Sequence, residues 1–211
     1  MFITFEGPEG AGKSTILKRI GDRLVDEGRN VLVTREPGDG HVGAQIREIL
    51  LHSEAIDSRC ELFLFLADRA HHVSTMIRPA LERDEIVLCD RYTDSTVVYQ
   101  AYARGLDPFG IRELNAFATD GLVPDLTLLL DVDPEVGLKR LTSKDRLDAE
   151  PIMFHRRVRE GFLAEAKKDS GRWRIVDASK TLDQVEFLCY AYVKELLSKR
   201  EQEPLPFSGL G

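Results

Sequence analysis

The sequence has few cysteines, no long apolar run and no excess of positive charge. Its three cysteines, Cys60, Cys89 and Cys189, lack CxxC spacing, which disfavours a disulfide framework and a zinc site and favours a reducing compartment. No apolar run approaches the roughly 20 residues that span a bilayer, and residues 1–5 lack the basic start of a signal peptide. We therefore expect a cytoplasmic protein without a membrane partner.

The charge balance excludes a further class of protein. Lysine and arginine number 29 against 36 acidic residues, a net charge of −7, which argues against a nucleic-acid-binding protein with a broad basic face. A site for a single nucleotide needs only a few local cations and stays possible. The length of 211 residues, with 43% hydrophobic and 31% charged residues, suits one globular α/β domain.

Five short apolar segments are predicted to be buried parallel strands: residues 2–5, 31–34, 86–89, 126–131 and 174–177. Segments with helical periodicity separate or follow them: residues 14–28, 61–83 (interrupted near Pro79), 109–120, 151–168 and 182–200. This alternation is typical of a parallel sheet with helices on both faces. We expect a three-layer α/β/α fold with a five-stranded parallel sheet, a single domain over residues 1–200, and a flexible tail over residues 201–211.

Residues 7–14, GPEGAGKS, match the phosphate-binding pattern G-x-x-x-x-G-K-[ST] in full. A predicted strand precedes this P-loop and an amphipathic helix follows it, as the pattern requires. Its glycines let backbone N–H groups surround phosphate oxygens. Lys13 is expected to reach the β- and γ-phosphates and Ser14 to ligate Mg²⁺. The loop residues of the predicted nucleotide site are Gly7, Pro8, Glu9, Gly10, Ala11, Gly12, Lys13, Ser14 and Thr15.

Two further charged segments follow predicted strands, at the sheet edge where ligands bind. Residues 34–38, TREPG, follow the second strand, and Asp90 and Arg91 follow the third. Asp90 is expected to hold Mg²⁺ through water, ahead of Asp131 at the end of the fourth strand, and Arg91 to bridge the phosphates that react. The guanine-reading N-K-x-D pattern is absent, which argues against a GTPase switch.

Five segments together resemble the bacterial thymidylate kinases, in the same order and across nearly the whole chain. They read EGPEGAGKS, TREPG, LFLFLADRAHHV, DRYTDSTVVYQAYARGL and PDLTLLLDV. The resemblance implies a P-loop kinase that moves the γ-phosphoryl group of ATP to dTMP with Mg²⁺. It also implies a homodimer packed through helices, including residues 61–70 and 109–120.

The resemblance implies a base-binding role for several matched residues. Phe65 is expected to stack on thymine, although it lies in an apolar run and a core position is the alternative. Arg69 is expected to bind O4 of the base, since arginine only donates hydrogen bonds and therefore disfavours the amine of cytosine. Thr96 and Gln100 are expected to read the base edge.

Other matched residues are expected to bind the phosphate and the sugar. Arg47 and Arg91 resemble the clamp on the dTMP phosphate, and Glu36 with Pro37 resembles the floor of that site. Glu9 resembles the acid near the 3′-hydroxyl. The complete predicted substrate set is Glu36, Pro37, Arg47, Phe65, Arg69, Arg91, Ser95, Thr96, Tyr99 and Gln100.

Residues 142–150 are short, polar and charged, and they resemble the lid of this family. Phosphoryl transfer requires cations around the moving group, and the P-loop contains no arginine, so the lid is expected to supply Arg146. The predicted catalytic set is Lys13, Arg91, Arg146 and Glu9. The lid is shorter than usual, with Ser143 and Lys144 where arginines are common, which leaves open whether Lys144 or Arg140 assists.

The adenine pocket and Asp39 are the last features of the predicted site. Arg140 and residues 178–180 are expected near the adenine of ATP. Asp39 stands where the family more often has a second glycine, and it adds a negative charge near a phosphate site.

Two alternative functions stay open. One is a kinase for another pyrimidine nucleoside monophosphate, and the other is a non-catalytic nucleotide-binding regulator. Arg69 and Gln100 favour a 4-keto pyrimidine, and Arg47 favours a monophosphate. The intact Lys13 and Asp90 argue against the regulator.

Overall fold

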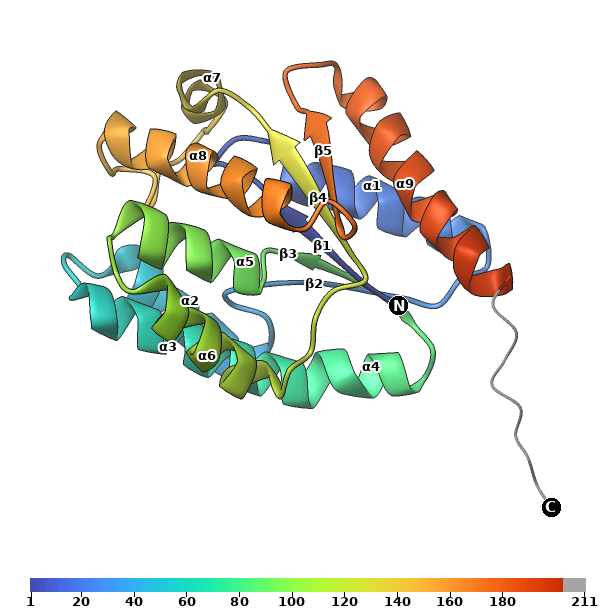
Figure 1. The fold of residues 1–211 in the computed structure, drawn as a ribbon, viewed down its shortest axis with the longest axis horizontal. Coiled ribbons are helices and arrows are strands. Elements are labelled where there is room, and N and C mark those ends of the chain that lie inside the picture. Colours follow the sequence, from blue (N-terminus) through green and yellow to red (C-terminus); the bar gives the residue numbers. More distant parts are fainter. Residues whose placement is uncertain (203–211) are drawn as a thin grey trace.

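A computed structural model describes residues 1–202 of the chain, and a sheet of five parallel strands forms its centre (Figure 1). The strands are β1 (Phe2–Glu6), β2 (Val31–Arg35), β3 (Ile86–Asp90), β4 (Leu126–Asp131) and β5 (Trp173–Asp177), in the order β2-β3-β1-β4-β5. The predicted parallel five-stranded sheet is confirmed, because short apolar runs between helical segments have few other ways to be buried.

Helices cover both faces of the sheet. Figure 1 shows α1 (Lys13–Asp26) and α9 (Leu182–Gln202) together on one face, and α8 (Ile152–Lys168) on the other. The remaining helices are α2 (Gly40–His52), α3 (Ser58–His72), α4 (Arg78–Glu82), α5 (Thr93–Thr96), α6 (Pro108–Thr119) and α7 (Pro134–Lys139), with π-helical turns η1 (Val73–Ile77) and η2 (Val97–Ala103). In residues 1–202, no helix is long and apolar enough to cross a membrane.

The helix predicted over residues 61–83 begins three residues earlier and changes form in its middle. The π-helical turn η1 separates α3 from α4, and Pro79 lies in the first turn of α4. Proline lacks the N–H that would bond four residues back, and its ring crowds that carbonyl. A wider turn directly before Pro79 relieves this conflict.

The predicted tail is wrong at its first two residues, because Glu201 and Gln202 continue α9. Residues 203–211, the rest of that prediction, lie outside the described part of the chain. No helix bounds were predicted from the sequence over α2, α5, α7 and η2.

Alternate strand residues build the two sides of the core. Ile3 and Phe5 of β1 pack with Leu17 and Ile20 of α1, whereas Phe2 faces the opposite side and packs with Ile77 of η1. Full burial of such a side chain stabilises the fold by about 1.5–3 kcal/mol. Apolar side chains therefore pack against both faces of β1. Because β1, β2 and β3 are parallel, their carboxyl ends lie at the same edge of the sheet.

Candidate active site

The carboxyl ends of β1, β2 and β3 open onto a cleft of about 280 Å³. The P-loop, the residues that follow β2 and β3, helices α2 and α3, η2 and the lid all contribute to its lining. All ten substrate-side residues predicted from the sequence lie in this lining: Glu36, Pro37, Arg47, Phe65, Arg69, Arg91, Ser95, Thr96, Tyr99 and Gln100.

The P-loop makes a tight turn between β1 and α1. Gly10 has a φ of 69°, and a Cβ there would lie 1.9 Å from the Gly137 carbonyl oxygen of α7, so only glycine fits. Lys13 donates to the carbonyl oxygens of Gly7 at 3.0 Å and Pro8 at 2.9 Å. Burial, with the nearby Arg91 charge, lowers the pKa of Lys13 to about 8. The loop carbonyls thus hold the ammonium group beside the helix N-terminus where phosphate is expected.

Ser14 and Asp90 bring a hydroxyl and a carboxylate together at the cleft. The Ser14 hydroxyl donates to Asp90 Oδ2 at 2.5 Å, and the buried Asp90 Oδ1 has no hydrogen-bond partner within residues 1–202. Hydroxyl and carboxylate oxygens suit Mg²⁺. By contrast, both Asp131 oxygens accept from Arg159, at 2.7 and 2.8 Å. Asp90 therefore fits a cation better than Asp131 does.

Arg91 joins the end of β3 to the P-loop. Its guanidinium group donates to the Gly7 carbonyl and to Ser95 Oγ, each at 3.2 Å, and to Glu9 Oε1 at 3.1 Å. Its backbone has a φ of 68°, a left-handed conformation that costs a non-glycine residue about 1–3 kcal/mol and often marks a functional site.

Glu9 is held as a carboxylate by several donors. The Tyr99 hydroxyl and Arg91 donate to it, and His155 Nδ1 lies 3.4 Å from its Oε2. Burial alone would raise the pKa of Glu9, but His155, Arg91 and Lys13 outweigh that effect and lower it to about 2. For His155, burial alone would lower the pKa, but the hydrogen bond and charge of Glu9 outweigh burial, and the pKa of His155 is raised. The sequence did not indicate His155, because a lone histidine on a helix carries no distinguishing pattern.

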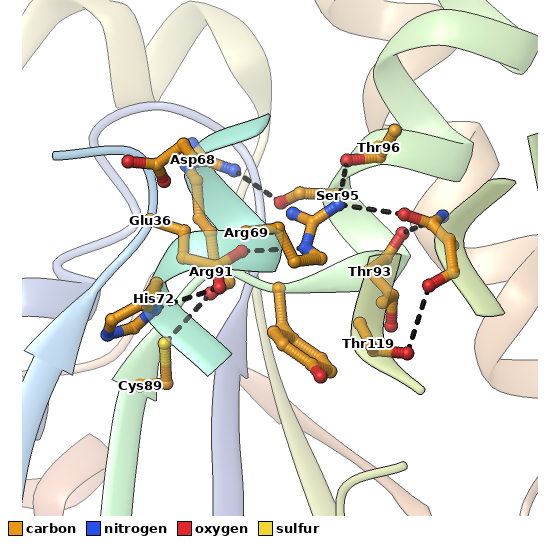
Figure 2. A network of polar contacts seen from close by, with 12 residues as sticks. Glu36, Asp68, Arg69, His72, Cys89, Arg91, Thr93, Ser95, Thr96 and Thr119 are labelled. Carbon is orange, nitrogen blue, oxygen red and sulfur yellow. Dashed lines mark hydrogen bonds and ion pairs between the residues drawn. The ribbon is translucent and has the colours of Figure 1, made fainter. Parts of the chain in front are cut away.

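Arg69 lies between two sets of hydrogen-bond acceptors (Figure 2). Its Nε donates to Glu36 Oε2 at 2.7 Å, and its Nη1 donates to Thr96 Oγ1 at 2.6 Å and Asn115 Oδ1 at 2.8 Å. Nη2 has no such partner within residues 1–202, and Arg69 lines the cleft. Figure 2 also shows His72 beside Glu36, with Nδ1 at 2.9 Å from Oε1. The sequence predicted Glu36 and Arg69 as separate contacts to substrate, and the structure joins them as a buried ion pair.

Phe65 and Arg47 border the cleft from α3 and α2. Phe65 is partly buried and packs in a small apolar cluster with Leu50 and Leu147. Phe65 therefore packs in an apolar cluster and also lines the cleft, and its stacking on thymine stays a prediction. Arg47 donates to the Pro37 carbonyl at 2.8 Å, which places its charge at the floor of the cleft.

Asp39 caps the first turn of α2. Its carboxylate accepts from the Gly40 N–H at 2.8 Å and from the Thr34 hydroxyl at 2.5 Å, as an N-cap residue does. Its role follows from α2, a helix that the sequence did not predict.

The lid over residues 142–150 does not bring Arg146 to the P-loop. Arg146 donates to Glu61 Oε2 at 2.6 Å and to the Leu50 carbonyl at 2.9 Å, and it is not part of the cleft lining, although Asp145 and Leu147 are. Lys144 is exposed. The lid arginine chosen from the sequence therefore reaches a phosphate only if its ion pair with Glu61 breaks.

Arg140 lies beside the P-loop rather than in the lid. It donates to the Gly10 carbonyl at 3.3 Å and the Ala178 carbonyl at 3.1 Å. The structure therefore brings together the two segments that the sequence predicted near adenine.

Comparisons with known proteins give one consistent result. The family model described as thymidylate kinase matches residues 5–187. A thymidylate kinase of Nitratidesulfovibrio vulgaris strain Miyazaki F is 53% identical over 88% of this chain and 92% of its own length. That of Thermomicrobium roseum is 51% identical over 96% of this chain and 99% of its own. The crystal structure of thymidylate kinase from Ehrlichia chaffeensis has a TM-score of 0.78 at 33% identity, covering 92% of this chain and 98% of that one.

Proposed function

The chain belongs to the thymidylate kinase family and is a dTMP kinase that uses ATP, and from this premise we propose how its cleft binds the two substrates. The observation that carries the proposal is the convergence of Lys13, Asp90 and Arg91 with Arg69 in one cleft. Phosphate-binding and base-binding groups thereby share a single space. No covalent intermediate is required, since positioned cations suffice for phosphoryl transfer.

We propose that the P-loop binds the ATP phosphates and that Arg140 lies near adenine. Lys13 exchanges its loop carbonyls for the β- and γ-phosphates. Ser14 and Asp90 would hold Mg²⁺. Their oxygens lie together, and the buried Asp90 Oδ1 has no partner within residues 1–202, which supports this proposal. When bound, the metal neutralises charge on the phosphates and orients them. The ion is expected to be exchangeable, because Mg²⁺ is held by few protein ligands.

On the acceptor side, we propose that dTMP binds with its base against Phe65 and its phosphate at Arg47. Arg91 lies between Gly7 and Ser95, a position from which it bridges the donor and acceptor phosphates. Glu9, with a pKa of about 2, accepts a hydrogen bond from the sugar 3′-hydroxyl.

We also propose that the lid closes over the cleft, excludes water and supplies Arg146 during transfer. In the structure Arg146 binds Glu61 at 2.6 Å, so catalysis by Arg146 includes the separation of this pair. The P-loop, residues 7–14, contains no arginine, and this supports the assignment of Arg146.

We further propose a cytoplasmic homodimer that packs through α3 and α6. Three phenylalanines on these helices are exposed: Phe63 at 59%, Phe109 at 71% and Phe117 at 85%. Apolar surface of this kind is typical of an interface. Sedimentation equilibrium should give twice the chain mass, and Phe117→Asp should shift the protein towards the monomer. A monomer at all concentrations would contradict the dimer.

Titration calorimetry tests the acceptor site directly. The protein is expected to bind dTMP at least about tenfold more tightly than thymidine, because Arg47 and Arg91 bind the phosphate. Arg47→Ala should reduce that ratio and leave thymidine binding unchanged. A matched control is Arg59→Ala, an exposed arginine at the start of α3. Equal affinities for dTMP and thymidine would contradict the proposed phosphate site.

A further inference from the structure

Glu61 on α3 is fully buried, with 0% exposure, and it accepts hydrogen bonds from three residues in two parts of the chain, η2 with its C-cap and the lid. Gln100 Nε2 donates to its Oε1 at 2.9 Å, and Arg146 Nη2 donates to its Oε2 at 2.6 Å. Arg104 donates to both oxygens, at 3.2 Å each. We call Glu61, Gln100, Arg104 and Arg146 the Glu61 cluster. The roles proposed above treat Glu61 only as the partner that Arg146 leaves.

The Glu61 cluster fixes which way the Gln100 amide points. With two guanidinium groups bound to it, Glu61 is a carboxylate, and a carboxylate only accepts hydrogen bonds. Gln100 must therefore present its NH₂ group to Glu61. Its carbonyl oxygen Oε1 is left buried and without a partner within residues 1–202, on a residue that lines the cleft. A buried acceptor without a partner costs about 1–3 kcal/mol unless a ligand supplies a donor.

We propose that Glu61 is a positioning residue that sets base specificity through Gln100. This inference rests on the proposed binding of the base at Arg69 and Gln100. A 4-keto pyrimidine presents an acceptor at O4 and a donor at N3–H. Arg69 supplies the donor, and Gln100, turned by Glu61, supplies the acceptor. Cytosine presents the reverse pair, an acceptor at N3 and an amine donor at N4, so both contacts with it are mismatched.

The lid is joined to the same cluster. Arg146 binds Glu61, and Glu150 accepts from Arg104 Nη1 at 2.6 Å. Arg104 is thus held between the buried carboxylate and the end of the lid. Because Arg104 donates to both Glu61 oxygens and is itself paired with Glu150, Glu61 keeps a cationic partner, and the Gln100 amide its orientation, when Arg146 leaves for the phosphate.

Glu61→Gln is the first variant to measure, because a glutamine at 61 can accept or donate and no longer fixes the Gln100 amide. The readout is the ratio of kcat/KM for dTMP to kcat/KM for dCMP. We expect this ratio to fall by about tenfold or more, chiefly through a higher KM for dTMP. A purely structural role for Glu61 would lower both values together and leave the ratio unchanged.

Glu165→Gln is the matched control. Glu165 is also a buried carboxylate, and it accepts from Tyr102 of η2, Arg112 and Lys168, but it lies outside the cleft lining. Its variant should be destabilised without any change in the ratio. A fall in the ratio in Glu165→Gln equal to that in Glu61→Gln would overturn the inference.

If circular dichroism shows that Glu61→Gln does not fold, Glu61→Asp tests the role of Glu61 in base specificity. Aspartate keeps a charge for the two arginines but withdraws it from Gln100 by one methylene, so the ratio should again fall. A folded Glu61→Asp or Glu61→Gln with the parent's ratio overturns the role of Glu61 alone. A parent enzyme that does not prefer dTMP to dCMP overturns the proposed base site instead.

Discussion

Ser14 and Asp90 are 76 positions apart in the sequence, yet the Ser14 hydroxyl donates a 2.5 Å hydrogen bond to the Asp90 carboxylate. The sheet explains this proximity. β1 and β3 are adjacent and parallel, with Phe5 paired to Asp90, so the P-loop and the residue that ends β3 leave the sheet at the same edge. The register of two buried strands thus builds the proposed cation site.

Asp90→Asn should raise the Mg²⁺ concentration needed for half-maximal activity and lower kcat by about 10²-fold, since one anionic ligand is lost. A Mg²⁺ titration of the rate of ATP consumption measures both effects. Asp131→Asn is the control, because Asp131 is bound to Arg159 and should leave the Mg²⁺ requirement unchanged. A larger rise in the Mg²⁺ requirement in Asp131→Asn than in Asp90→Asn would instead assign the metal to Asp131.

Arg146→Ala should lower kcat by about 10²–10³-fold, the effect of losing one contact to transition-state charge. Steady-state kinetics with ATP and dTMP measure this loss, with Lys144→Ala as the control in the same lid. If kcat stays within a few-fold of the parent, Arg146 serves only to bind Glu61. The catalytic cation would then be Arg140 or Lys144.

ATP binding should be accompanied by proton uptake at about pH 8.5. Burial and Arg91 lower the pKa of Lys13 to about 8, so its amine is largely neutral at that pH before ATP binds. The ATP phosphates favour the ammonium form and raise its pKa, which draws a proton from solvent. Calorimetry in two buffers of different ionisation enthalpy measures the uptake. It should vanish in Lys13→Arg, and its absence from the parent would show that Lys13 is already charged.

Glu6→Gln should change how stability depends on pH. Burial, followed by the Asp94 charge, raises the pKa of Glu6 from 4.5 to about 7. Between these values the folded chain holds a proton that the unfolded chain has lost, so the Glu6 contribution to stability falls as pH rises from 4.5 to 7. The difference in unfolding free energy, variant minus parent, should therefore increase by up to about 3 kcal/mol over this range.

Urea unfolding at about pH 5 and about pH 8 measures that difference. Glutamine keeps one acceptor oxygen, so at most one of the hydrogen bonds from the Tyr92 N–H at 2.9 Å and the Ser95 hydroxyl at 2.5 Å is lost. That loss shifts the variant at all pH values and does not affect the slope. A constant difference between variant and parent would mean that Glu6 keeps an ordinary pKa in the fold.

The strands and the P-loop were predictable because their signals are local. A short apolar run has one way to be buried in a parallel sheet, and GPEGAGKS specifies its own loop geometry. Helix α2 was missed because it begins at Gly40, the last residue of a GDG segment that resembles a turn, and because it contains a second glycine, Gly43. Its stability comes from the Asp39 cap and from packing against α3, which no local pattern shows.

The orientation of side chains was the part of the site that the sequence could not predict. Glu61 lies in a predicted helix, but its partners Gln100 and Arg146 are 39 and 85 positions away. Likewise, Arg69 and Glu36 each matched a separate role, and only the fold shows that they form an ion pair with N–O distance 2.7 Å. Roles that depend on two distant segments require coordinates.

The most direct test of the dTMP kinase assignment measures ATP consumption with Mg²⁺ against dTMP, dUMP, UMP, dCMP, AMP, GMP and thymidine. We expect a strong preference for dTMP, with little turnover of dCMP and none of thymidine. Faster turnover of another acceptor would contradict the thymine-binding roles of Phe65, Arg69 and Gln100. No turnover of any acceptor by protein that binds ATP would contradict the enzyme itself and favour a nucleotide-binding regulator.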